Sequence, residues 1–192
     1  MLKGGLAVRL IFLCHAGTRS MREGGFPAPD EALDEGGKRK ASELSFRFPD
    51  ASVILCSPAR AALETMHFAG LSGGVDQALR DIDHDDWSGR SFAAVHEADP
   101  DGLAAWIANP TGATPGGESF DHLVARIMPW LAGVAGGTDT VIAVTHPMII
   151  RAALAVAIGI PADVTMRIDC GPLTQVELSF NRLWRLKAIR PD

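Results

Sequence analysis

The sequence predicts an α/β fold of three layers, with helices on both faces of a mostly parallel central sheet. Three short apolar runs, residues 7–13, 52–56 and 141–145, have the length and β-branched content of buried strands. Helical patterns separate these runs, and such alternation is typical of a parallel sheet. The chain has 192 residues, and we expect a single domain over residues 1–192.

The predicted helices follow the strands in order. Residues 33–48 carry the first helical pattern. Residues 58–68 carry the second, with Pro58 in the first turn, where the missing N–H of proline costs nothing. The apolar residues of 119–134 fall on one helical face, and we expect Pro129 to kink or break this helix.

The rest of the chain completes the predicted layers. Residues 147–158 are apolar almost all round, which predicts a buried helix. Residues 174–179 and 183–188 predict two further strands. Residues 81–117 are richer in Gly, Pro and Asp, and we interpret them as a helical excursion over the edge of the sheet that carries the site.

Composition narrows the classes of function. Hydrophobic residues make up 47% of the chain and charged residues 21%, as in ordinary globular proteins. The net charge of −5 argues against a nucleic-acid partner. No stretch approaches the ~18 uncharged apolar residues of a membrane span. The three cysteines are far apart and form no CxxC pair, which suits a reducing cytoplasm and leaves no disulfide scaffold. The oligomeric state stays open.

Two histidines stand where predicted strands end. His15 closely follows the first apolar run, and His146 directly follows the third. Because ligands bind beyond the carboxyl ends of parallel strands, both imidazoles and Arg60, which follows the second run, are expected at one edge. One imidazole could attack phosphorus while the other stabilises the charged oxygens. Alternatively, each histidine only caps a strand end and bonds to backbone.

The sequence gives little support for metal-binding or thiol chemistry. The acidic run 81–86 would need Gly at its sixth position and Glu at its twelfth to be an EF-hand, but Asp86 and Phe92 stand there. The run therefore predicts either a solvated turn or a carboxyl that donates a proton. A tyrosine-phosphatase loop would need Arg six residues after Cys14, where Ser20 stands. We expect no metal and no cofactor.

Six motifs along the chain occur together in one known family. They are L-I-F-L-C-H-A-G-T (10–18), L-D-E-G (33–36), S-P-A-R-A-A-L-E-T (57–65), L-R-D-I-D-H-D-D-W-S-G (79–89), P-G-G-E-S (115–119) and T-H-P-M-I-I-R-A (145–152). In this order and spacing they resemble the histidine phosphatase superfamily, in its phosphoglycerate-mutase-like branch 1. The resemblance implies the phosphoglycerate-mutase-like version of the predicted three-layer fold.

The resemblance also implies roles for residues. His15 matches the nucleophile that forms a phosphohistidine, and His146 matches the second histidine of the phosphate pocket. Asp81 matches the acidic residue that protonates the leaving group, although Glu is usual there. We expect Thr18, Arg22 and Arg60 to bind substrate. The implied activity is hydrolysis of a small phosphorylated metabolite; mutase activity is less expected, because an isomerase must hold two phosphate positions.

The sequence departs from the family at the phosphate pocket. Cys14 and Ala61 stand where the family has arginines, and Pro147 replaces a glycine and removes an N–H donor. Each lost charge-assisted hydrogen bond is worth ~1.5–3 kcal/mol. Two functions therefore stay open: a divergent phosphatase that forms a phosphohistidine, or a catalytically impaired relative that binds a phosphorylated or anionic ligand or a protein partner without turnover.

Overall fold

A mixed sheet lies at the centre of the computed structural model, which describes residues 7–44, 53–137 and 140–192. Across these residues the sheet has six strands in the order β3-β2-β4-β1-β5-β6. Their bounds are Val8–Cys14 (β1), Val53–Cys56 (β2), Gly74–Val75 (β3), Thr140–Thr145 (β4), Gln175–Asn181 (β5) and Leu183–Arg190 (β6). Strands β3, β2, β4 and β1 run parallel, whereas β5 and β6 pair antiparallel beside β1.

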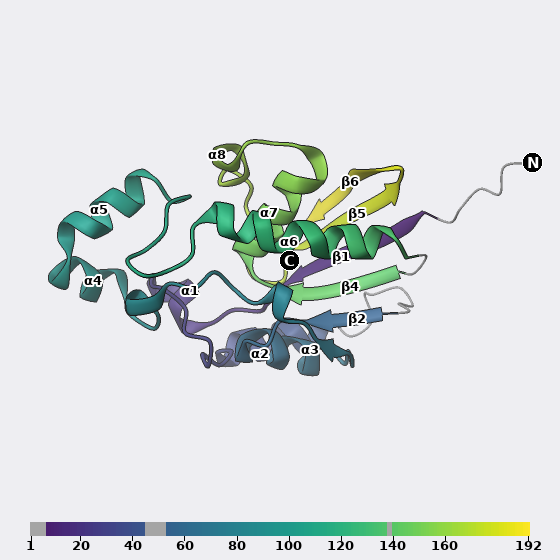
Figure 1. Ribbon diagram of the computed structural model, residues 1–192. Coiled ribbons are helices and arrows are strands. Elements are labelled where there is room, and N and C mark those ends of the chain that lie inside the picture. Colours follow the sequence, from purple (N-terminus) through teal and green to yellow (C-terminus); the bar gives the residue numbers. More distant parts are fainter. Residues whose placement is uncertain (1–6, 45–52, 138–139) are drawn as a thin grey trace, which may run out of the picture.

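Helices cover both faces of this sheet (Figure 1). Glu35–Glu43 (α2) and Arg60–Phe68 (α3) form one layer, and Phe120–Ala135 (α6) and Pro147–Ile158 (α7) form the other. The shorter helices are Arg19–Glu23 (α1), Phe92–Ala98 (α4), Pro100–Ala108 (α5) and Ala162–Thr165 (α8). The predicted three-layer α/β architecture is confirmed.

Strand β1 is buried on both faces, which explains why its sequence is a continuous apolar run. Because side chains alternate along a strand, successive residues enter different cores. Leu10 and Phe12 belong to the core cluster that includes residues of α6 and α7. Ile11 and Leu13 belong to the cluster that includes residues of α2 and α3. The central strand therefore ties the two helical layers together.

The register of β1 and β4 sets the position of the site. The two strands are parallel neighbours, and Cys14 pairs with Thr145 at their carboxyl ends. His15 directly follows β1 and His146 directly follows β4, so both residues leave the sheet at the same edge. The prediction that these two strands are adjacent and central is confirmed.

Details of three predicted helices differ from the structure. Pro58 lies outside α3, which begins at Arg60 with Ala59 as its N-cap. Helix α6 runs unbroken through Pro129. The helix expected over 33–48 begins at Glu35, because the side chain of its N-cap Asp34 accepts a hydrogen bond from Gly37 N–H at 2.7 Å. It ends at Glu43, and residues 45–48 lie outside the described residues.

The excursion between β3 and α6 holds two short 3₁₀ helices, Gln77–Leu79 (η1) and Asp85–Trp87 (η2), followed by α4 and α5. Helices α4 and α5 extend away from the sheet in Figure 1. They have an apolar cluster of their own, made of Phe26, Trp87, Val95 and Leu103 with Trp106 packed against it. The segment just before η2 brings Asp81 back to the sheet edge.

Candidate active site

His15 is held with one ring nitrogen bound and the other free. The side chain is only 3% exposed, and its backbone N–H donates to Thr145 O at 2.9 Å. Nδ1 lies 2.8 Å from Ala16 O. A carbonyl oxygen can only accept, so Nδ1 carries the proton and Nε2 keeps its lone pair. Nε2 has no hydrogen-bond partner among the described residues.

The surroundings keep His15 uncharged at neutral pH. Burial, above all, and the neighbouring His146 lower the pKa of its imidazole to about 4, against the opposite effects of the Ala16 carbonyl and Asp81. The ring centroids of the two histidines lie 5.0 Å apart, with an angle of 62° between the ring planes. A neutral imidazole with a free lone pair is the form that acts as a nucleophile.

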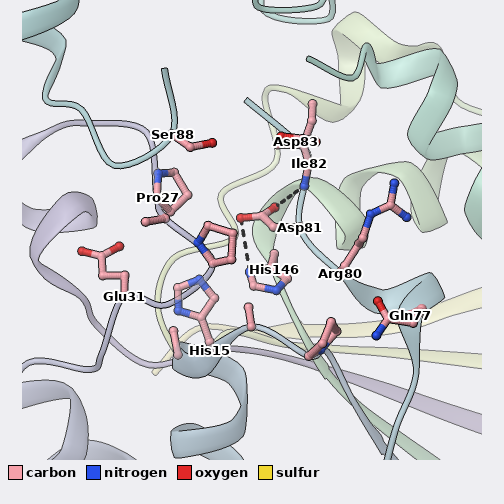
Figure 2. A pocket seen from close by; sticks show the side chains of 15 residues that line it. His15, Pro27, Glu31, Gln77, Arg80, Asp81, Ile82, Asp83, Ser88 and His146 are labelled. Atoms are coloured by element: carbon pink, nitrogen blue, oxygen red, sulfur yellow. Dashed lines mark hydrogen bonds and ion pairs between the residues drawn. The ribbon is translucent and has the colours of Figure 1, made fainter. Parts of the chain in front are cut away.

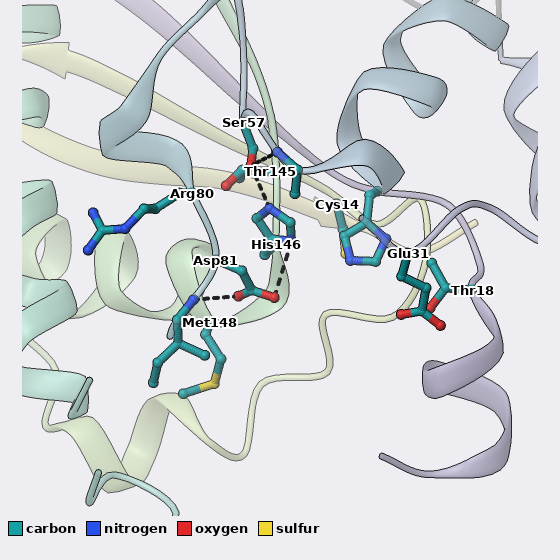
Figure 3. Close-up of polar contacts among 12 residues, drawn as sticks. Cys14, Thr18, Glu31, Ser57, Arg80, Asp81, Thr145, His146 and Met148 are labelled. Carbon is teal, nitrogen blue, oxygen red and sulfur yellow. Dashed lines mark hydrogen bonds and ion pairs between the residues drawn. The ribbon is translucent and has the colours of Figure 1, made fainter. Parts of the chain in front are cut away.

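His146 is fixed from two sides. Nε2 lies 2.7 Å from the hydroxyl of Ser57, and Nδ1 lies 3.2 Å from a carboxylate oxygen of Asp81. The second contact is an ion-pair contact and not a well-aligned hydrogen bond. Figure 3 shows His146 between Ser57 and Asp81. Two strand-end residues and one loop residue thus form a chain of polar contacts beside the nucleophile.

Asp81 is ionised in this arrangement. Burial alone would raise the pKa of its carboxyl. The neighbouring His146 and His15, together with the N–H of Ile82, which donates to the carboxylate at 2.8 Å, outweigh burial and lower the pKa to about 2. The carboxylate must therefore take up a proton before it can donate one.

A partly buried arginine holds the segment that carries Asp81. Arg126 of α6 donates to the carbonyl oxygens of Ala78, Arg80 and Asp81 at 2.9, 2.8 and 3.2 Å. Its guanidinium also bonds Glu118 at 3.0 Å. Glu118 in turn accepts from Arg80 at 2.7 Å. These contacts fix the backbone before and at Asp81, and so fix the distance from its carboxylate to His146.

A cavity of about 300 Å³ opens beside the two histidines. Figure 2 shows His15 and His146 at its base, with Asp81 above His146. The lining residues are His15, Pro27, Ala28, Pro29, Glu31, Pro58, Ala59, Ala61, Gln77, Arg80, Asp81, Ile82, Asp83, Ser88 and His146. The cavity is large enough for a phosphoryl group and a small organic residue.

The three residues predicted to act catalytically, His15, Asp81 and His146, lie together at this cavity. Of the residues predicted to bind substrate, none lines it. Thr18 is buried as the N-cap of α1, where its hydroxyl accepts from Met21 N–H at 3.4 Å.

The two arginines predicted to bind substrate are engaged elsewhere. Arg22 pairs with Asp34. Arg60 pairs with Glu64 at 2.8 Å and keeps 57% of its side chain exposed. Neighbouring helical residues point about 100° apart, so Arg60 faces outward while Ala61 faces the cavity.

Arg80, Glu31 and Ser57 were not among the predicted site residues. Arg80 and Glu31 line the cavity, and Ser57 contacts His146. Arg80 and Ser57 lie inside two of the recognised motifs, so the motifs carried a signal for both. Nothing in the local sequence around Glu31 distinguishes it from a surface carboxylate.

The positions that depart from the family pattern are apolar or buried. Cys14 is fully buried, and its thiol lies 3.6 Å from the carbonyl of Cys170. Burial, above all, raises the pKa of this thiol. Ala61 is 6% exposed and presents a methyl group to the cavity. Neither position supplies a cation.

No group of three or more His, Cys, Asp or Glu side chains in residues 7–44, 53–137 and 140–192 is arranged to hold a metal ion. Over the same residues, no helix has the length and apolar character needed to cross a membrane.

A comparison with known families shows which superfamily the chain belongs to. The family model of the histidine phosphatase superfamily (branch 1) matches residues 10–189. The chain belongs to this superfamily. In this histidine phosphatase homologue, His15, Asp81 and His146 lie together at one cavity.

Several named phosphatases are similar to the chain. It is 30% identical over 175 residues to phosphoserine phosphatase 1 of Hydrogenobacter thermophilus, covering 85% of this chain and 82% of that protein. It is 31% identical over 124 residues to glucosyl-3-phosphoglycerate phosphatase of Mycolicibacterium vanbaalenii, covering 58% and 55%. A bifunctional protein of Mycobacterium tuberculosis is 28% identical over 174 residues, and there the match covers 85% of this chain but only 48% of the relative. The chain thus spans about half the length of that relative.

Solved structures agree with the fold. The native structure of a mycobacterial glucosyl-3-phosphoglycerate phosphatase matches with a TM-score of 0.80 at 27% identity, covering 94% of this chain and 97% of that one. A putative alpha-ribazole-5'-P phosphatase of Escherichia coli matches with a TM-score of 0.86 at 19% identity, covering 96% and 98%, and supports the fold alone.

Proposed function

We propose that this protein hydrolyses a phosphomonoester of a small metabolite through a phosphohistidine on His15. The free Nε2 of His15 carries the proposal. It belongs to a neutral, buried imidazole whose other nitrogen is bonded to Ala16 O, and it lies at a cavity of about 300 Å³. Membership of the histidine phosphatase superfamily and similarity to named phosphatases support the same reaction.

The reaction has two displacements at phosphorus. In the first, the Nε2 lone pair of His15 forms the N–P bond while the bond from phosphorus to the ester oxygen breaks. The positive charge that develops on the ring is stabilised by the Ala16 carbonyl, which accepts from Nδ1–H at 2.8 Å. In the second, water attacks phosphorus, the N–P bond breaks, and orthophosphate leaves as the monoanion that keeps both protons of the water, with His15 neutral again.

The leaving oxygen needs a proton, and we propose that Asp81 delivers it. Because the pKa of Asp81 is about 2, its carboxylate first has to be protonated. The monoanion of a phosphomonoester, whose second pKa is about 6, brings a proton into the cavity. His146 holds Asp81 in place through the contact of 3.2 Å, and its ring stands beside the transferring group.

The second candidate function is binding without turnover. Cys14 and Ala61 favour it, because neither offers the charge-assisted hydrogen bonds that a phosphate dianion needs. In that case the same cavity would bind a phosphorylated or anionic ligand, or the chain would bind a protein partner, without turnover. Cys14, Cys56 and Cys170 are free and buried, and we propose a cytoplasmic location because thiols persist there.

Steady-state hydrolysis of 4-nitrophenyl phosphate separates the two candidates. We expect slow turnover by the wild-type protein and none above background by His15→Asn. His96→Asn is the matched control, since His96 is an exposed histidine of α4 outside the cavity, and it should hydrolyse at the wild-type rate. Turnover that survives in His15→Asn would contradict the proposal. Phosphate binding to a wild-type protein that shows no turnover would favour the second candidate.

A further inference from the structure

The cavity beside His15 carries an unusual set of charges for a phosphate site. Three carboxyl side chains line it, Glu31, Asp81 and Asp83, against one guanidinium, that of Arg80. His15 is neutral, because burial lowers its pKa to about 4. A phosphate dianion entering this cavity would add negative charge where carboxylates already outnumber cations.

The guanidinium of Arg80 is already neutralised by the protein. It pairs with Glu118 at 2.7 Å, and Glu118 also pairs with Arg126. Arg80 therefore contributes less to the cavity than a free guanidinium would. Ala61 leaves open the space in which a longer, charged side chain would fit. The protein thus supplies no uncommitted cation at the described lining.

Of the three carboxylates, one is paired within the protein and one is exposed to solvent. Asp81 pairs with His146 at 3.2 Å. Asp83 accepts from Asp85 N–H at 2.8 Å and is exposed at the outer side of the cavity. Glu31 also has no ion-pair partner among the described residues, but it is only partly exposed, and Arg19, a cation that acts on it electrostatically, is bonded to Glu23 at 2.7 Å.

Glu31 is nevertheless held firmly in place. Its two carboxylate oxygens accept from the N–H and the hydroxyl of Ser20 at 2.7 and 2.6 Å. Each carboxylate oxygen can accept a further hydrogen bond, so the group is positioned but not saturated. Figure 2 shows Glu31 on the side of His15 away from Asp81 and Arg80.

We propose that the substrate is a phosphomonoester that carries its own cation, a primary ammonium or guanidinium group, which binds Glu31 while the phosphoryl group faces His15. The inference rests on the proposed function, because the unpartnered Nε2 of His15, on a side chain only 3% exposed, is what places the phosphoryl group. The lining of the cavity also includes the apolar side chains of Pro27, Pro29, Ala59 and Ala61, which suits a short methylene linker. The ligand's own cation then compensates the negative charge of its phosphoryl group, as arginines at positions 14 and 61 would have done.

Non-hydrolysable phosphonates test this proposal without requiring turnover. We would titrate wild-type protein calorimetrically, at pH 7 and low salt, with aminoalkylphosphonates of two to five methylenes and with alkylphosphonates of matched length. An ammonium group stays protonated at this pH. The best aminoalkylphosphonate should bind at least about 10-fold more tightly than its alkyl match, a difference of about 1.4 kcal/mol.

Variants of Glu31 then locate the cation. Glu31→Gln should bring the affinity ratio close to one, and Glu31→Asp, which keeps the charge on a shorter side chain, should leave an intermediate ratio. Glu35→Gln is the matched control, since Glu35 is 91% exposed on α2 and pairs with Lys38 outside the cavity, and it should keep the wild-type ratio. Circular dichroism would show that each variant is folded.

Equal or weaker binding of every aminoalkylphosphonate, or no binding of any phosphonate, would overturn the proposal. So would a ratio that Glu31→Gln leaves unchanged. These outcomes are distinct from failure of the proposed function, which is read from His15-dependent hydrolysis of an aryl phosphate that carries no cationic group. If the protein hydrolyses the aryl ester but gains no affinity from the ammonium group, the proposed function stands and the inference is wrong.

Discussion

Ala61→Arg should make this protein a better phosphatase. Ala61 lies in the first turn of α3, is 6% exposed and presents its methyl group to the cavity beside His15. An arginine there can extend into about 300 Å³ of space without displacing core side chains. One charge-assisted hydrogen bond to the phosphoryl group is worth ~1.5–3 kcal/mol. The corresponding rise in kcat/KM is about 10- to 100-fold.

The assay is hydrolysis of 4-nitrophenyl phosphate by wild type, Ala61→Arg and Ala61→Met. Methionine fills similar space without a charge, so it controls for volume and for packing at the start of α3. We expect the gain in kcat/KM for arginine alone, with Tm of both variants near that of wild type. If both folded variants behave alike, or if arginine brings no gain, then the missing guanidinium is not what limits this site and the reasoning is refuted.

Three further predictions concern the polar groups around the nucleophile. Because the pKa of His15 is about 4, kcat/KM for 4-nitrophenyl phosphate should fall only as pH drops through about 4, where the imidazole becomes protonated; a fall centred near 6.5, the ordinary histidine pKa, would contradict a buried neutral nucleophile. Asp81→Asn should slow hydrolysis of an alkyl phosphate by ~10²–10⁴-fold and of the nitrophenyl ester much less, since nitrophenolate leaves without a proton; equal losses would remove Asp81 from the role of proton donor. Arg126→Met should lower the free energy of unfolding by about 3 kcal/mol, because it removes the donor to three carbonyls and one of the two arginines that pair with Glu118. Urea denaturation would measure this loss, and a change below ~0.5 kcal/mol, the size expected of an ordinary surface substitution, would show that the contacts are not structural.

The sheet and the histidine pair could be predicted because they depend on local sequence. Apolar runs that end in a histidine place His15 and His146 at strand ends, and a parallel sheet brings such ends together. The structure pairs the last residues of β1 and β4, Cys14 and Thr145, as that argument requires. Asp81 could be named only from the family motif, because its approach to His146 depends on a loop held by Arg126 from another helix.

The side chains that line the cavity beside the histidines could not be predicted, because they depend on rotation about a helix and on competing ion pairs. Arg60 was expected at the site from its place after β2, but a shift of one residue along α3 turns it outward to Glu64. Arg22 is likewise taken up by Asp34. Glu31 reaches the cavity only because Ser20 holds its carboxylate, a contact between α1 and the loop that follows it.

Trapping the phosphoenzyme tests the central claim most directly. Wild-type protein would be mixed with 4-nitrophenyl phosphate and quenched in alkali, in which phosphohistidine survives. The phosphorylated residue would then be mapped by peptide mass spectrometry, and acid would release the phosphate from it. We predict one phosphoryl group, on His15, which is absent from His15→Asn and present in His96→Asn. A phosphoryl group on another residue, or continued turnover with no phosphoryl group on His15 at any quench time, would contradict the account.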